Sequence, residues 1–301
     1  MRFSKYHGTG NDFVMIDDRN DRLVVEPWLV AAVCARGLGV GADGIIRIAP
    51  SPSADFFMDY WNADGNVAEM CGNGIRCLAK YVYDRGLTTK TELDVDTRAG
   101  LKHVSIEVED GLAARITVGM GTPAFARKSL PMTGDPFDTF VGQPLDVSGR
   151  SFRATAVSMG NPHCVLFLGP DDDLEDIDVP GLGSIVERRR EFPSRTNVEF
   201  VKVNEGRVDT RVWERGSGET MACGTGACAA LVASSLAGLV ERRAEVRFPG
   251  GLLWVDWRPD DQVFLTGPAV CVFDAELDRA WLQQAEQEGR KMAGAVPGYA
   301  P

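Results

Sequence analysis

Short apolar runs with many β-branched residues recur along the chain and predict strands joined by tight turns. The runs at 103–110 and 112–120 meet at Asp110-Gly111, a dipeptide that favours a two-residue hairpin turn. A second pair, at 197–203 and 207–214, surrounds Asn204-Glu205-Gly206. Further runs follow at 244–248, 252–257, 262–267 and 269–273. We therefore expect sheets rich in antiparallel strands, with one or two helices in each half of the chain.

Two segments carry apolar residues at the spacing of an amphipathic helix, and each ends at a glycine. In 72–86 the spaced positions are Ile75, Leu78, Ala79 and Val82. In 224–238 they are Cys228, Leu231, Val232 and Ser235. This spacing places four side chains on one buried face, and Gly86 and Gly238 are typical helix stops. A polar helix is expected from Glu276, and the last residues, 294–301, are expected to fray.

The chain contains a weak internal repeat. Gly10-Asn11 opens the apolar run GNDFVMID, and Gly160-Asn161 opens GNPHCVLFL 150 positions later. Cys71 leads the segment CGNG, and Cys223 leads CGTG 152 positions later. Two features in the same order at nearly the same offset indicate duplicated domains.

A stretch dense in glycine and proline, at 119–149, marks the boundary between the halves. We expect it to form a connector with turns rather than one regular element. We expect an N-terminal lobe at 1–120 that carries Cys71 and is joined by the last strand and tail, about 267–301. The C-terminal lobe, at 121–266, would carry Cys223.

Cys71 and Cys223 each stand directly before a predicted helix. Helix N-termini expose backbone N–H groups that favour a nearby anion, including a thiolate. This effect is worth about 0.3–2 kcal/mol, which lowers a thiol pKa by roughly one unit. Apolar burial raises the pKa instead. Such a balance suits a pair in which one cysteine is a base and the other an acid.

Other interpretations of the cysteines and the glycine-rich segments are weaker. Cys77 and Cys228 lie inside the helices and are expected to pack rather than react. The intervals within each cysteine pair are six and five residues, which is not zinc-like spacing, even if His163 and Cys164 added ligands. The loop GLGVGADG at 37–44 lacks the lysine of a P-loop and the spacing of a dinucleotide fold.

Composition narrows the class of protein. The chain has 301 residues, 44% of them hydrophobic and 25% charged, as in folded globular proteins. A net charge of −11 without long basic runs argues against nucleic acid and anionic membranes as partners. No long apolar stretch and no signal-like start are visible, so we expect a cytoplasmic protein whose seven cysteines are reduced.

The motifs around both cysteines resemble those of the diaminopimelate epimerase family. The resemblance covers residues 3 to about 274 and leaves out the polar tail. It rests on HGTGNDF (7–13), GADG (41–44), NADGNVAEMCGNGIRC (62–77), GNPHCV (160–165), RTNVEFV (195–201) and WERGSGETMACGTGACA (213–229).

This resemblance implies an α/β fold of the α+β type, with two similar, pseudo-symmetric domains. Each would be a mixed, mostly antiparallel, barrel-like sheet around a central helix, with the active site in the cleft between them. It implies conversion of LL-diaminopimelate to the meso form, in lysine and peptidoglycan precursor biosynthesis. It also implies no pyridoxal phosphate, metal or reducible cofactor, a small zwitterionic substrate, and a homodimer.

The resemblance carries roles onto matching positions. Cys71 and Cys223 would be the base and acid pair, and His163 would lie close to the thiols. The backbone donors to the reacting carboxylate would be Gly72, Asn73, Gly224 and Thr225. The substrate, chiefly its distal end, would be held by Asn11, Asn62, Asn161, Asn197, Glu214 and Arg215. Some family members have glutamine where this chain has Gly44, so a side-chain contact is expected to be missing there.

These residue types fit the chemistry. Removing a hydrogen from an α-carbon builds charge on the neighbouring carboxylate, and two helix N-termini could stabilise it without a cofactor. Inversion needs removal on one face and return on the other, which a thiolate and a thiol can supply. Arg215 offers a fork to a second carboxylate, and Glu214 can face an ammonium. Without the motif, these two would read as a surface ion pair.

Several alternatives remain open at this stage. Proline racemases and hydroxyproline epimerases also use paired cysteines, but for substrates with one amino-acid head group. A phenazine-type isomerase of the same fold is disfavoured because both cysteines are present. A thiol redox sensor would form a reversible disulfide as its function. An amino-acid binding protein would need no matched thiols, and a pyridoxal enzyme would absorb visible light.

Overall fold

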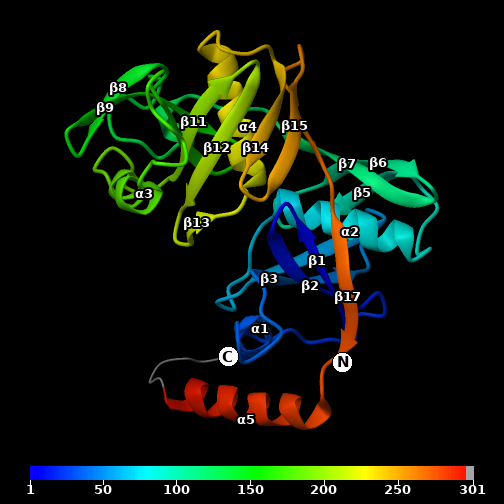
Figure 1. Ribbon diagram of the computed structural model, residues 1–301. Coiled ribbons are helices and arrows are strands. Elements are labelled where there is room, and N and C mark those ends of the chain that lie inside the picture. The colour runs from blue at the N-terminus through cyan, green and yellow to red at the C-terminus, as the bar shows by residue number, and fades with distance from the viewer. Residues whose placement is uncertain (296–301) are drawn as a thin grey trace. The chain divides into compact units, whose positions relative to one another are not determined.

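A computed structural model describes residues 1–295 of the chain (Figure 1). The chain divides into two units, each with its own core. Unit 1 comprises residues 1–8, 12–116 and 269 onward, and unit 2 comprises 9–11 and 117–268. Among the described residues, no helix is both long and apolar enough to cross a membrane.

Unit 1 is built from strands that flank one central helix. Its strands are β1 (Arg2–Gly8), β2 (Asn11–Asp17), β3 (Gly44–Ala49), β4 (Phe56–Asn62), β5 (Glu92–Asp96), β6 (Lys102–Glu109), the first part of β7 (Leu112–Gly121), and β17 (Val270–Glu276). Its helices are α1 (Pro27–Cys34), α2 (Gly72–Asp84) and α5 (Arg279–Ala295). Strand β17 pairs antiparallel with β1, and β1 pairs with β2. Then β2–β3 is parallel, β3–β4 antiparallel, β4–β5 parallel and β5–β6 antiparallel.

Unit 2 repeats this series of pairings. Its strands are β8 (Gln143–Val147), β9 (Arg150–Ser158), β10 (Pro162–Phe167), β11 (Asn197–Asn204), β12 (Arg207–Glu214), β13 (Gly218–Thr220), β14 (Arg243–Phe248), β15 (Gly251–Trp257) and β16 (Val263–Gly267). Its helices are α3 (Val179–Glu187), α4 (Gly224–Leu236) and the short 3₁₀ turn η1 (Arg127–Ser129). The pairs β8–β9 and β9–β10 are antiparallel, β10–β11 parallel, β11–β12 antiparallel, β12–β14 parallel and β14–β15 antiparallel.

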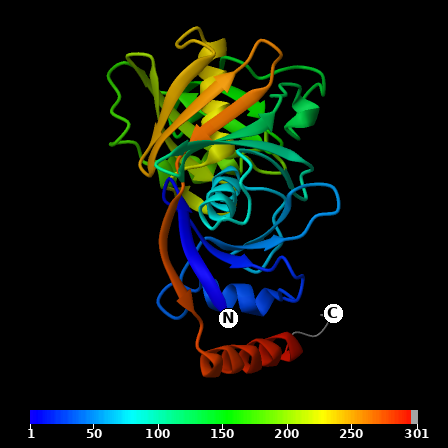
Figure 2. The same cartoon turned by 90° about the vertical axis from the view of Figure 1, so that its right-hand side faces the viewer.

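The same order of parallel and antiparallel pairs in both units confirms the expected pseudo-symmetric fold. In unit 2, α4 packs against β9, β10, β11, β12, β14, β15 and β16, so the sheet curls around this helix (Figures 1 and 2). In unit 1, α2 packs against β1, β3, β6 and β17. Each unit is thus a mixed sheet wrapped around one helix.

Both predicted helices form at the expected positions. The stop residues Gly86 and Gly238 adopt positive φ angles of 66° and 72°, which glycine tolerates best. Beyond each, the next N–H group bonds back into the last turn: Leu87 N donates to Val82 O and Leu239 N to Ser234 O. Both helices therefore end in the same glycine-based motif.

The prediction of a single buried face is too narrow for α4. Every residue from Gly226 to Ser234 is buried, whereas Ser235, expected on the buried face, is only half-buried. A strand layer that surrounds a helix covers all of its sides. The small residues of GTGACAALVASS allow this close approach.

The predicted hairpins also form, with β6–β7 around Asp110-Gly111 and β11–β12 around Glu205-Gly206. All four turn residues have positive φ. The connector at 119–149 is less irregular than expected, because its end forms β8 and pairs with β9. That strand has only five residues, too few to show a clear alternating pattern.

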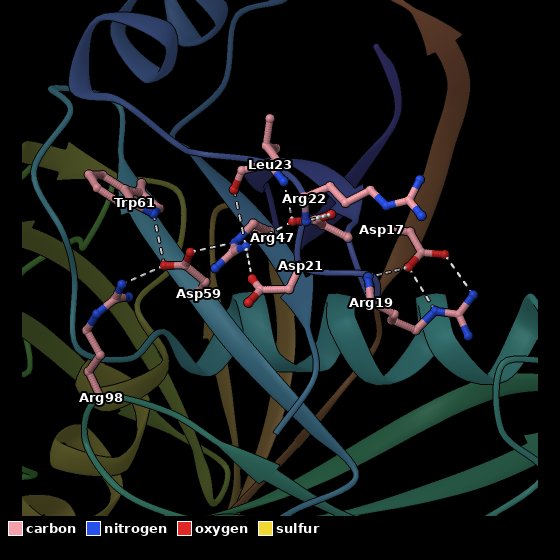
Figure 3. Close-up of polar contacts among 10 residues, drawn as sticks. Asp17, Arg19, Asp21, Arg22, Leu23, Arg47, Asp59, Trp61 and Arg98 are labelled. Carbon is pink, nitrogen blue, oxygen red and sulfur yellow. Dashed lines mark hydrogen bonds and ion pairs between the residues drawn. The ribbon is translucent and has the colours of Figure 1, made fainter. Parts of the chain in front are cut away.

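A network of ion pairs joins the strands of unit 1 (Figure 3). The Arg47 side chain on β3 contacts Asp18 at 2.9 Å, Asp21 at 2.8 Å and Asp59 at 2.8 Å. Asp59 on β4 also accepts hydrogen bonds from Arg98, at 2.6 Å, and from the indole of Trp61, at 2.9 Å. The nearly buried Asp59 carboxylate is therefore fully paired, as buried charge requires.

This network supports the segment that leads to Cys71. Trp61 makes a bridge with Val67 in that segment, and the guanidinium of Arg98 stacks over the Trp61 ring. Next to Arg98, Ala99 N donates to Glu69 O at 3.3 Å. The chain that enters α2 is thereby attached to β4 and to the segment after β5.

The polar tail helix forms as α5 and packs on α1 (Figure 2). Trp28 of α1, together with Trp281 and Leu282 of α5, joins the apolar cluster of unit 1. A Cβ atom at Gly289 would lie 2.4 Å from the Trp28 Cβ, so the helices meet closely at this glycine. The expected fraying of the last residues concerns mainly 296–301, which lie outside the described residues.

Candidate active site

Cys71 is the residue that caps the N-terminus of α2. Its backbone is extended, with φ −139° and ψ 119°, and its Sγ accepts a hydrogen bond from Gly74 N at 3.4 Å. The side chain is half-buried. Gly74 lies close to the strands, because a Cβ there would be 2.6 Å from Ile46 Cδ1, and this side chain would have to shift to admit it. The sulfur thus lies at the first turn of the helix, as the sequence predicts.

Arg76 lies one turn into α2 and is completely buried. Its guanidinium donates to Gly72 O and to Asn73 Oδ1, both at 3.0 Å. Arg76 therefore connects Gly72 and Asn73, two residues whose backbone N–H groups are expected to bind the reacting carboxylate, and it places a positive charge near them. The sequence reasoning missed Arg76, although a lone charge within the apolar segment GIRCLA was a signal.

Cys223 caps α4 with the same geometry as Cys71 in α2. Its φ is −127° and its ψ 123°, and its Sγ accepts from Gly226 N at 3.4 Å. The Thr225 hydroxyl lies 3.5 Å from the sulfur. Only 5% of Cys223 is exposed, so this thiol is more enclosed than Cys71.

The surroundings of Cys223 disfavour its thiolate. Burial raises the pKa of the Cys223 thiol well above its ordinary value, and the Glu214 and Glu199 carboxylates raise it further. The hydrogen bond from Thr225 acts in the opposite direction. Burial and the nearby carboxylates therefore favour the protonated thiol of Cys223, which is the form that an acid requires.

A cluster of buried and half-buried polar side chains is linked to Cys223. His163 Nδ1 lies 2.6 Å from Glu199 Oε1, and His163 Nε2 lies 3.0 Å from Asn161 Oδ1. Asn161 Nδ2 donates to Thr225 Oγ1 at 3.3 Å. His163 is thus linked to Cys223 through two further side chains. The sequence reasoning missed Glu199, which appears in the segment NVEF as a charge among apolar strand residues.

Asn197, Glu214 and Arg215 lie near one another in unit 2. Asn197 Oδ1 accepts from Arg215 N at 2.8 Å, and its Nδ2 donates to Pro162 O at 3.1 Å. Glu214 accepts from the Thr220 hydroxyl at 2.5 Å. The side chain of Arg215 donates to Ser194 O at 3.2 Å. Asn197 therefore holds the backbone that presents Arg215.

The expected site residues divide between the two units. Unit 1 holds Asn62, Cys71, Gly72 and Asn73. Unit 2 holds Asn161, His163, Asn197, Glu214, Arg215, Cys223, Gly224 and Thr225. Asn11 also belongs to unit 2, because residues 9–11 pack beside the chain before Cys223. A Cβ on Gly250 would lie 2.0 Å from Thr9 O, and one on Gly10 would lie 2.9 Å from Met221 Cβ.

Gly44 does not leave an open space where a longer side chain is missing. A Cβ at this position would lie 2.4 Å from Trp61 O and 2.7 Å from Tyr60 Cε2. The carbonyl of β4 occupies the place that a side chain would need. A side chain at this position would therefore require β3 and β4 to shift in this structure.

All seven cysteines are free thiols. Within residues 1–295, no group of three or more His, Cys, Asp or Glu side chains is arranged to hold a metal ion. The chemistry that these residues can perform by themselves is proton transfer by the thiols, next to hydrogen-bond donors at helix N-termini.

Comparison with known proteins gives a family match in two segments, one in each half of the chain. A profile of the family described as diaminopimelate epimerase matches residues 3–126 and 155–272. The diaminopimelate epimerase of Desulforudis audaxviator is 50% identical over 284 residues, covering 93% of this chain and all of that protein. That of Pelotomaculum thermopropionicum is 46% identical over 279 residues, covering 92% of this chain and 98% of that protein.

Solved structures share the fold at low identity. A Bacillus anthracis phenazine biosynthesis protein of the PhzF family has a TM-score of 0.66 and 18% identity, covering 92% of this chain and 99% of that chain. A hydroxyproline epimerase from Agrobacterium vitis also has a TM-score of 0.66, with 16% identity and 93% of each chain covered. At such identities the likeness concerns architecture only.

Proposed function

Because the chain belongs to the diaminopimelate epimerase family, we propose that it interconverts LL-2,6-diaminopimelate and meso-diaminopimelate. It is an isomerase that acts on a small amino acid, in the biosynthesis of lysine and peptidoglycan precursors. The observation that carries this proposal is the pair of matched helix caps, Cys71 and Cys223, in a chain that aligns with these epimerases over nearly its whole length.

The two thiols act as base and acid at one α-carbon. In the LL-to-meso direction or its reverse, one thiolate removes the α-hydrogen and the other thiol returns a proton from the opposite face. The raised pKa of Cys223 supports its role as the protonated partner in the resting enzyme, which leaves Cys71 as the base. After one inversion the charges are exchanged, and the pair is set for the reverse reaction.

Backbone N–H groups stabilise the charge that builds on the reacting carboxylate. The first N–H groups of an α-helix have no acceptor within the helix, and they point toward its N-terminus. In this chain they are those of Gly72, Asn73, Gly224 and Thr225. Each donor of this type contributes about 2.7–4 kcal/mol in comparable sites. The buried Arg76 adds positive charge behind the first pair.

The second amino-acid head of the substrate is held by polar side chains. Arg215 binds the distal carboxylate with its guanidinium fork, and Glu214 faces the distal ammonium. The remaining contacts come from amides, which both donate and accept: Asn11, Asn62, Asn161 and Asn197.

Incubation of the purified enzyme with LL-diaminopimelate in heavy water tests the function directly. Without added cofactor, the meso product is expected to form with solvent deuterium at its inverted α-carbon. Mass spectrometry and chiral chromatography measure both. L-proline and trans-4-hydroxy-L-proline serve as control substrates and are expected to show no exchange. Exchange of either control, or none with diaminopimelate, would contradict the assignment.

We also propose that the enzyme is a cytoplasmic homodimer with lobes at 1–120 plus 267–301 and at 121–266. The lobe proposal is supported by the division of the chain at 116/117 and 268/269. A reducing compartment suits two thiols that must stay free. On β17, three apolar side chains are between 42% and 53% exposed: Val270, Val272 and Phe273. An exposed apolar stretch of this kind supports the proposal that a second copy of the chain covers it.

Analytical ultracentrifugation is expected to give twice the chain mass at micromolar concentration. The variant Val272→Asp, which places a charge in the exposed apolar stretch of β17, is expected to sediment as a monomer. A control variant with the same change on another exposed apolar residue, Leu112→Asp, is expected to remain a dimer. A monomeric native enzyme would disprove the homodimer.

A further inference from the structure

The pair formed by Glu199 and His163 is completely shielded from solvent, because both side chains are 0% exposed. Their closest atoms, Glu199 Oε1 and His163 Nδ1, lie 2.6 Å apart. The other oxygen, Glu199 Oε2, has no hydrogen-bond partner among the described residues. A lone carboxylate in such a place would be strongly destabilised.

This burial determines how many protons the pair holds. Burial raises the pKa of the Glu199 carboxyl, and the neighbouring His163 lowers it. Because no other charge pairs with Glu199 Oε2 among the described residues, we take the pair to be neutral overall: either imidazolium with carboxylate, or imidazole with carboxylic acid. In the first case both ring nitrogens of His163 carry hydrogen. In the second case Nδ1 accepts from the acid and Nε2 carries the hydrogen. His163 Nε2 is therefore a donor in both.

A donor at His163 Nε2 fixes the direction of the remaining contacts. Asn161 turns its oxygen toward this nitrogen, at 3.0 Å, and its amide nitrogen donates to Thr225 Oγ1 at 3.3 Å. The Thr225 oxygen accepts from Asn161, which leaves the hydroxyl hydrogen available for Cys223 Sγ, 3.5 Å away.

We propose that Glu199 is a positioning residue that acts through His163, Asn161 and Thr225 to aim the Thr225 hydroxyl hydrogen at the sulfur of Cys223. The proposal deepens the role proposed above for Cys223 and rests on it. It adds a residue that touches neither the thiol nor the substrate.

This chain of hydrogen bonds from Glu199 to Cys223, called the relay below, matters because Cys223 must also work as a thiolate. Burial and the Glu214 and Glu199 carboxylates oppose that state, and the donated hydrogen of Thr225 stabilises it. If the His163–Glu199 pair lost its proton, Nδ1 would keep the remaining hydrogen and Nε2 would become an acceptor. Asn161 would then turn over, and the Thr225 hydrogen would point to Asn161 instead of the sulfur.

The protonation of His163 can be read directly, since the chain has only three histidines. With ¹⁵N-labelled histidine, one imidazole is expected to show a protonated Nε2 at neutral pH in the substrate-free enzyme. Loss of this signal in His163→Gln assigns it. A Nε2 signal typical of an unprotonated nitrogen would overturn the direction of the relay.

The rate of alkylation of Cys223 by iodoacetamide, followed by peptide mass spectrometry across pH, tests the effect on the thiol. Thr225→Val removes the donor and is expected to slow alkylation at neutral pH roughly tenfold. Thr225→Ser restores the hydroxyl and is expected to react at the native rate. In Glu199→Gln, the amide oxygen can accept a hydrogen bond from a protonated His163 Nδ1. The imidazole can then be neutral with no hydrogen on Nε2. A slowing of about two- to threefold is expected there.

In a neutral pair, the loss of the Glu199 carboxylate is matched by the loss of the imidazolium charge of His163. Glu199→Gln therefore changes the direction of donation without changing the net charge near the sulfur. An unchanged or faster alkylation of Cys223 in a folded Glu199→Gln enzyme would overturn the role of Glu199. A merely structural role would lower thermal stability and leave the alkylation profile in place. Both measurements omit substrate, so their failure is distinct from failure of the epimerase reaction in heavy water.

Discussion

Cys71→Ala and Cys223→Ala are each expected to lower the rate of epimerisation by at least about 100-fold, because each removes one of two proton-transferring groups. The residual thiol faces only one side of the α-carbon. Each variant should therefore retain, at most, slow deuterium exchange without inversion, and in opposite stereoisomers for the two variants. Chiral product analysis in heavy water, with LL- and meso-diaminopimelate as substrates, measures both effects.

The same helices supply matched controls. Cys77 and Cys228 are buried cysteines in α2 and α4, and burial raises the pKa of the Cys77 thiol. Cys77→Ala and Cys228→Ala are expected to cost about 1 kcal/mol of unfolding free energy and to keep the native turnover number. Near-native turnover by Cys71→Ala or Cys223→Ala, or an inactive but folded control, would contradict the two-thiol mechanism.

Arg215→Ala is expected to reduce kcat/KM by roughly 30-fold or more, mainly through a higher KM, because the distal carboxylate of the substrate loses its charged partner. The backbone at Arg215 is held by Asn197, so the loss should be confined to the side chain. Steady-state kinetics with diaminopimelate, together with a substrate-binding isotherm, separate binding from chemistry.

Two further variants sharpen this test. Arg215→Lys keeps the charge but loses the fork, and it is expected to recover only part of the affinity. Arg207→Ala removes the arginine at the start of β12, the strand after which Arg215 follows. Arg207 pairs with Asp209 at 2.7 Å, and its loss should leave KM unchanged. If Arg215→Ala had the native KM, Arg215 would not be the distal anchor.

The elements that depend on near neighbours were predictable from the sequence. The two helices, their glycine stops and the two hairpins follow from apolar spacing and from residues that tolerate positive φ, all within a few positions. The capping positions of Cys71 and Cys223 follow for the same reason. The internal repeat also indicated the duplicated fold, whose second half reproduces the strand pairings of the first.

The contacts that complete the second half of the site depend on distant segments. His163 stands opposite Asn197 in the parallel pair β10–β11, and Glu199 follows two positions later on the same face of the sheet. That register joins residues 36 positions apart, and no local pattern encodes it. The burial of α4 on all sides and of Arg76 near the start of α2 likewise arises only when strands close around each helix. The sequence by itself determined where the thiols stand on their helices. Only the tertiary structure decided which buried groups surround them, because the pKa of a thiol depends on neighbours brought together by strand pairing.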